Sequence, residues 1–89
     1  MKGLVALVKE QGVNFAVVNV KRSVMTGPAS NKNQLVSAFS REFGVPAVLM
    51  AQDSRGRMEF FGRRDLTQWL ANNILDPGQL PWREFSSAA

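Results

Sequence analysis

The stretch AVLMAQDSRGRMEFFG, residues 47–62, decides the fold of this chain. Its two outer segments, residues 47–52 and 57–62, are short and rich in apolar side chains, as β-strands are. Between them, the DSRG segment at residues 53–56 has the composition of a turn. A connection this short makes the two strands run antiparallel. We therefore predict a β-hairpin over residues 47–62.

The sequence before the hairpin predicts a strand followed by a helix. Residues 13–20, VNFAVVNV, carry β-branched and apolar side chains on both faces, which is typical of a strand covered on both sides. Apolar side chains that recur every four positions predict a helix over residues 31–43, with Ser30 as its N-cap. Gly44 is a natural residue to end this helix, and Pro46 biases the chain out of helical conformation.

The two ends of the chain predict two further helices. Residues 3–11 place side chains at helical spacing on one face, and Gly12 then resembles a helix stop. The members of that face are Leu4, Leu7, Val8 and Gln11. Asp65 with Gln68 three residues later resembles a capping box, which predicts the start of the last helix.

Together these elements predict an α/β domain with the order α-β-α-β-β-α over residues 1–76, followed by a C-terminal tail at residues 77–89. The first two strands, joined through a helix, run parallel if they are neighbours in one sheet. The second strand of the hairpin adds an antiparallel edge. The expected architecture is a small three-stranded mixed sheet with helices packed on it.

Residues 43–74 resemble the C-terminal half of a thioredoxin-like fold. In that family a helix ends in Gly-hydrophobic-Pro with a cis proline, and two antiparallel strands, a glycine and a terminal helix follow. The matching positions here are Gly44-Val45-Pro46, the two hairpin strands, Gly62 and the helix from Asp65. Residues 45–66 also resemble small bacterial proteins of unknown function found on mobile elements, and this second resemblance implies no activity.

Two features depart from the thioredoxin-like pattern. The Cys-x-x-Cys element is absent, and no counterpart of the family's first strand precedes residue 13. The resemblance therefore implies a redox-inactive adaptor for protein partners. In such an adaptor the Val45-Pro46 loop would present its backbone to an extended peptide.

The composition excludes several classes of site. The 89 residues contain neither Cys nor His, which rules out disulfides, thiolate chemistry and zinc sites built on those residues. Catalytic systems that pair Ser or Cys with His are excluded for the same reason. The apolar run at residues 4–8 is too short for a signal peptide or a membrane span, so we expect a cytoplasmic protein. The net charge of +4 favours an anionic partner.

The strongest candidate site is the arginine-rich hairpin. Phosphate contacts need clustered guanidinium groups, and an exposed aromatic ring can stack on a base. The residues concerned are Arg55, Arg57, Phe61, Arg63 and Arg64. The plainer interpretation is an edge strand whose charges keep it soluble, while Met58 and Phe60 face the core. The acidic residues of the same stretch, Asp53, Glu59 and Asp65, dilute its positive charge.

A second candidate site surrounds the Gly27-Pro28 loop that follows the first strand. Lys21, Arg22 and Lys32 lie near this loop in the sequence. Ligands of open α/β sheets bind beyond the carboxyl ends of parallel strands, which is where these cations are expected. A plain connecting loop is the alternative, because one glycine makes a poor cradle for a phosphate.

The tail carries large apolar residues outside the last helix, namely Leu80, Trp82 and Phe85. Pro77 and Pro81 keep this segment from being helical. One interpretation is a strap that folds back over a small core. The other is an anchor for a protein partner, with Trp82 and Phe85 at its centre, or for a second copy of the chain in a homodimer.

We therefore expect a non-catalytic binding module for nucleic acid or another anionic macromolecule, such as an acidic protein, without cofactor or metal. Asp53 and Glu59 flank the turn, but they lack the nearby lysine that a nuclease metal site would use. The alternative function is the redox-inactive thioredoxin-like adaptor. A continuous basic surface joining Lys21-Arg22 to the hairpin would favour the first function, and a cis Pro46 would favour the second.

Overall fold

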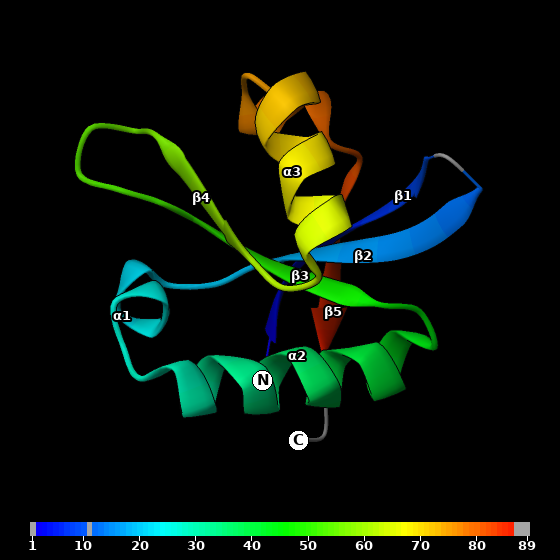
Figure 1. Cartoon of the computed structure of the whole chain (residues 1–89), viewed down its shortest axis with the longest axis horizontal. Helices are drawn as coiled ribbons and strands as arrows, with labels where there is room; N and C mark the ends of the chain where they lie inside the picture. The colour runs from blue at the N-terminus through cyan, green and yellow to red at the C-terminus, as the bar shows by residue number, and fades with distance from the viewer. Residues whose placement is uncertain (1, 11, 87–89) are drawn as a thin grey trace.

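The computed structural model describes residues 2–10 and 12–86, and its elements follow the order β-β-α-α-β-β-α-β. The strands are β1 (Lys2–Glu10), β2 (Val13–Asn19), β3 (Ala47–Gln52), β4 (Met58–Phe61) and β5 (Trp82–Ser86). The helices are α1 (Arg22–Met25), α2 (Ala29–Phe43) and α3 (Arg64–Asn73), and a short 3-10 helix spans Pro77–Gln79. Figure 1 shows α2 on one face of the twisted sheet and α3 on the other.

The five strands of the described residues belong to one sheet with the order β4-β3-β2-β1-β5. Strands β2 and β3 pair in parallel, and each of the other neighbouring pairs is antiparallel. The central strands β2 and β3 are buried along most of their length because helices cover both faces. These two strands therefore fix the positions of the segments that follow their carboxyl ends, α1 after β2 and the hairpin turn after β3.

The sheet separates two hydrophobic cores. Val18 and Leu49 contribute to the core under α1 and α2, which we call the α2-side core. Val17 and Val48 contribute to the core under α3, which we call the α3-side core. Adjacent residues of a strand point to opposite faces, so an uninterrupted apolar run supplies both cores at once.

The predicted N-terminal helix is wrong, because its residues form β1. A short apolar run such as residues 4–8 has no clear period and fits a helix and a strand equally well. In β1, Leu4 and Leu7 lie on opposite faces and are 37% and 53% exposed, so they form no common apolar face. Gly12, predicted as a helix stop, has a φ of 75° in the tight turn between β1 and β2. Gln11, a predicted member of the helical face, lies outside the described residues.

The predicted three-stranded sheet is also wrong, since the sheet has five strands. Residues 82–86, predicted as part of a tail, form the edge strand β5 beside β1. The two corrections are linked, because a strand at 82–86 has no partner if residues 3–11 are helical. Residues 87–89 of the predicted tail lie outside the described residues.

The middle of the chain follows the prediction except at α1, a short helix in the segment that was expected to be a loop. The β3–β4 hairpin is antiparallel, and α2 connects the parallel strands β2 and β3. Gly44 ends α2 with a φ of 70°, and its N–H donates to the carbonyl of Ser40 at 2.9 Å. The predicted caps are wrong: Pro28 rather than Ser30 precedes α2, and Arg63 rather than Asp65 precedes α3.

Candidate nucleic-acid interface

The parallel pairing of β2 with β3 brings two basic segments to the same end of the sheet. Asn19 of β2 is level with Met50 of β3, and the N–H of Val20 donates to the carbonyl of Met50 at 2.8 Å. Just beyond this level, β2 is followed by Lys21-Arg22 and β3 is followed by the hairpin turn. In Figure 1, α1 and the β3–β4 turn accordingly lie on the same side of the molecule.

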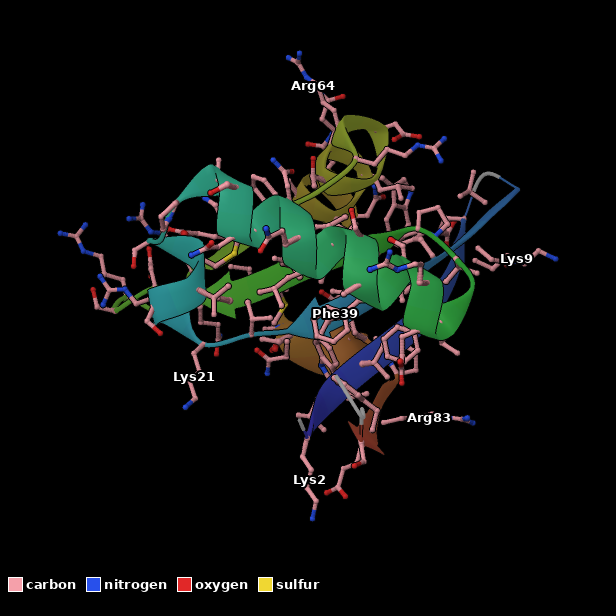
Figure 2. The ribbon with its side chains drawn as sticks, turned by 90° about the horizontal axis from the view of Figure 1, so that it is seen from below. Lys2, Lys9, Lys21, Phe39, Arg64 and Arg83 are labelled. Carbon is pink, nitrogen blue, oxygen red and sulfur yellow. The ribbon has the colours of Figure 1, made fainter. Side chains whose placement is uncertain are left out.

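Four cations therefore lie around the carboxyl ends of the two parallel strands, and we call them the strand-end cluster. Its members are Lys21, Arg22, Arg55 and Arg57. All four residues are exposed. Figure 2 shows Lys21 extending away from the body of the protein. This is the position at which open α/β sheets bind their ligands.

The hairpin tip, residues 53–57, is organised by the carboxylate of Asp53. Its Oδ1 atom accepts hydrogen bonds from the backbone N–H groups of Arg55 at 2.8 Å and Arg57 at 2.9 Å. Its Oδ2 atom forms an ion pair with Nε of Arg57 at 3.0 Å. Gly56 has a φ of 79°, a conformation that suits glycine at the end of the turn. The tip is consequently held in one shape by contacts within five residues.

These contacts also set the charge state of the tip. The backbone N–H of Arg57 has the largest effect on the pKa of Asp53 and lowers it. Desolvation, the second-largest effect, raises this pKa, but the N–H of Arg55 and the Arg57 guanidinium lower it further, so the pKa is lowered overall. Asp53 is therefore anionic at neutral pH and offsets much of the charge of Arg57. No described carboxylate forms an ion pair with Arg55, so its full charge faces solvent.

Arg63 and Arg64 lie at the opposite end of β4 and do not join the strand-end cluster. The chain turns sharply from β4 into α3 at Gly62, where a Cβ atom would lie 3.1 Å from the carbonyl oxygen of Ala47. Arg63 then forms an ion pair between its Nε and Oδ1 of Asp65 at 2.9 Å. Figure 2 shows Arg64 extending outward from α3. The arginines predicted as one patch therefore form two separate groups.

Phe61 is half-buried and packs against the α2-side core. The ammonium group of Lys32 lies 4.7 Å from the centroid of its ring and also donates to the carbonyl of Met25 at 3.1 Å. Lys32, a candidate phosphate ligand in the sequence, thereby links α1, α2 and β4. Both side chains are engaged within the fold, and the Phe61 ring is not a free surface for stacking.

The Val45-Pro46 loop is engaged in a similar way. No peptide bond among the described residues is cis, so the Val45–Pro46 bond is trans, unlike the bond that the thioredoxin-like resemblance implies. The carbonyl of Pro46 accepts a hydrogen bond from the N–H of Ala16 at 2.9 Å, and Val45 packs against the α2-side core. This carbonyl is already paired with β2 and is not open to an extended peptide.

Trp82 and Phe85 lie on opposite faces of β5. Trp82 packs against the α3-side core, and its Nε1 donates to the carbonyl of Pro77 at 2.7 Å. Phe85 packs against the α2-side core, edge-on to the rings of Phe39 and Phe43 at centroid distances of 5.7 and 5.4 Å. Both rings are partly buried, as expected for a segment that folds back over the core.

Sequence reasoning missed the role of Asp53 as the organiser of the tip. Asp at the first position of a tight turn commonly accepts hydrogen bonds from backbone N–H groups further along, so the DSRG segment did carry this signal. The link between Lys32 and Phe61 had no such signal, because α2 and β4 are distant in the sequence.

Comparison with known proteins gives no relative: no protein-family model, curated protein or solved structure significantly matches this chain. Among residues 2–10 and 12–86, no cluster of three or more acidic side chains could hold a metal ion. No helix in these ranges is long and apolar enough to cross a membrane.

Proposed function

We propose that this protein is a binding module for nucleic acid and that the strand-end cluster is its contact surface. The observation that carries the proposal is the parallel β2–β3 pairing, which brings Lys21-Arg22 and the hairpin tip to the same end of the sheet. Clustered Lys and Arg side chains neutralise phosphates and release counterions, and this effect supplies most of the affinity in non-specific binding. Lys21, Arg22, Arg55 and Arg57 are the proposed phosphate ligands.

The local balance of charge supports an anionic ligand. Asp53 lies beside the two arginines of the cluster, and its carboxylate is turned inward to the backbone of the tip. Glu59 on β4 is exposed and forms no ion pair among the described residues, so it limits the patch on one side. Arg63 and Arg64 lie at the opposite end of β4, and Arg63 is paired with Asp65, so neither belongs to this contact surface.

The redox-inactive adaptor receives less support. Its proposed peptide-binding loop would need a free backbone at Val45-Pro46, and the carbonyl of Pro46 is paired with β2. Its proposed aromatic anchors, Trp82 and Phe85, pack against the two cores of the fold. A partner at these positions would have to displace internal contacts before it gained new ones.

The test is a fluorescence-anisotropy titration with short DNA and RNA over salt concentrations of about 50 to 200 mM. A cluster variant replaces Lys21, Arg22, Arg55 and Arg57 with Gln. A matched control variant replaces four exposed cations away from the cluster, Lys9, Arg41, Arg64 and Arg83, with Gln. Both variants have the same net charge, so a difference between them reports the location of the site.

We expect micromolar binding by the wild type, with log K falling against log salt with a slope of about −3 to −4 if all four cations contact phosphates. The cluster variant should lose most of this affinity and most of the slope, while the control variant should keep both. An equal loss of affinity in the two variants would mean that binding depends on net charge and not on the location of the cations. No binding at low salt would remove nucleic acid as the ligand.

A further inference from the structure

We infer that the nucleic acid is a B-form DNA duplex whose major groove receives the hairpin tip, with the flanking cations on the phosphates beside it. This inference rests on the proposed function and specifies its ligand. Three observations lead to it: the placement of the aromatic rings, the shape of the tip, and the position of Lys21-Arg22 at the same end of the sheet.

The aromatic side chains are all committed to the cores. The chain has six Phe, two Trp and no Tyr. The α2-side core holds Phe39, Phe43, Phe61 and Phe85, and the α3-side core holds Phe15, Phe60, Trp69 and Trp82. Proteins that bind single strands obtain about 1–3 kcal/mol from each base stacked on an aromatic ring. This surface offers no such platform, so its affinity must come from phosphates, and a duplex presents these at the higher density.

The tip has the shape of a groove-binding element. It ends a two-stranded ribbon whose strands are about 4.8 Å apart, and the major groove of B-form DNA, about 12 Å wide, admits such a ribbon. In Figure 1 the β3–β4 turn reaches beyond α1 at one side of the sheet. Ser54 and Gly56 on either side of Arg55 are small and exposed, which leaves the Arg55 guanidinium free to reach into the groove.

The tip is also pre-organised for insertion. The hydrogen bonds from Arg55 and Arg57 to Asp53 hold it in one conformation before any ligand arrives. Binding therefore loses little backbone entropy. Because Lys21 and Arg22 lie at the same end of the sheet as the tip, we expect them to meet the phosphates along the groove edge when the tip is in the groove. The major groove of duplex RNA is deep and narrow, and it does not accept a ribbon of this width.

The first experiment compares three labelled probes of one sequence: a DNA duplex, one of its single strands, and the corresponding RNA duplex. We expect the DNA duplex to bind about tenfold more tightly than either of the others at ~0.1 M salt. If the single strand or the RNA duplex binds as tightly, the inference is overturned while the proposed function stands. If no probe binds, both fail together.

The second experiment tests the groove. A DNA duplex with bulky substituents at the C5 position of its pyrimidines fills the major groove and leaves the phosphates unchanged. We expect it to bind about tenfold more weakly than the unmodified duplex. Arg55→Gln should lose affinity for the unmodified duplex, while Lys9→Gln, an equal change of charge on the remote β1, should keep it. Unchanged affinity for the substituted duplex would overturn the major-groove assignment.

Discussion

At the level of single residues, Asp53 has two opposite effects on the strand-end cluster. Its carboxylate subtracts one charge from a basic surface and pairs with Arg57. Its Oδ1 atom also accepts the two backbone hydrogen bonds that give the tip its shape. An acidic residue that dilutes the patch in the sequence is thus the residue that positions Arg55 in the structure.

Two substitutions that make the same change of charge separate these effects. Asp53→Asn keeps an oxygen acceptor for the backbone N–H groups and releases Arg57, so we expect tighter binding to duplex DNA than in the wild type. Asp53→Ala removes the same charge together with the acceptor, so we expect weaker binding than in Asp53→Asn and a lower melting temperature. Anisotropy titrations and thermal melts measure both quantities. Equal affinity of the two variants would mean that charge matters and the shape of the tip does not.

The lowered pKa of Asp53 predicts how its contribution to stability depends on pH. A carboxylate with a lowered folded-state pKa stabilises the fold fully above its unfolded pKa, here the ordinary value of 3.8. The contribution is lost as the pH falls from that value through the folded-state pKa. We expect the difference in melting temperature between wild type and Asp53→Ala to be constant from neutral pH to about pH 5 and to shrink as the pH falls below 3.8. A difference that grows on acidification would contradict the assignment.

Sequence reasoning at this scale succeeds where the contacts are local. The exposure of the Lys21-Arg22 side chains and of the turn arginines follows from their place in polar segments. The burial of Phe61 could not be predicted. Strand alternation shows which face of the sheet its side chain lies on, but it does not show which element covers that face. Its partner Lys32 approaches from α2, about 30 positions earlier in the chain.

At the level of elements, β5 depends on packing on both of its faces. Phe85 lies edge-on to Phe39 and Phe43 of α2, and Trp82 lies on the other face. Pairing with β1 alone gives a short edge strand little stability. The aromatic contacts therefore hold the C-terminal strand in the sheet.

Phe85→Ala tests this dependence. We expect the free energy of unfolding to fall by about 2–3 kcal/mol, less than for a fully buried phenylalanine because Phe85 is only half-buried. Glu84→Ala, on the same strand but exposed, should change it by less than about 0.5 kcal/mol. Denaturant titrations followed by circular dichroism measure both. If the two variants lose the same amount, the aromatic contacts are not what holds β5.

The sequence predicted the elements that carry their own local pattern and did not predict those that depend on a partner strand. Strands β2, β3 and β4 and helices α2 and α3 each carry a local pattern of apolar residues and turn residues. Strand β1 does not, because LVALV at residues 4–8 is apolar at every position, and only its register with β2 makes it a strand. The sequence does not predict strand β5, because the pattern of its partner β1 predicts a helix. The placement of Lys21-Arg22 and the hairpin tip at one end of the sheet was predictable only from adjacent parallel strands, and the resemblance to a thioredoxin-like fold left that pairing open.

At the level of the whole molecule, one sheet serves two cores, and this arrangement should make them a single cooperative unit. Strands β2 and β3 contribute alternate residues to each core, so loss of either core leaves one face of both strands uncovered. A chain of 89 residues buries too little surface for half of it to persist alone. The strand-end cluster, which depends on the β2–β3 pairing, should then disappear in the same transition.

The positions of the tryptophans make this testable. Trp69 and Trp82 both belong to the α3-side core, so tryptophan fluorescence reports on that core, whereas far-ultraviolet circular dichroism reports on the whole fold. Phe39→Leu perturbs the α2-side core, and we expect it to lower stability by about 1–2 kcal/mol. Because the sheet couples the cores, the fluorescence and dichroism midpoints should shift to lower denaturant by the same amount. If the dichroism midpoint falls while the fluorescence midpoint stays at its wild-type value, the α2-side core unfolds on its own. In that case α1, which carries Arg22 of the strand-end cluster, would unfold before the hairpin tip does.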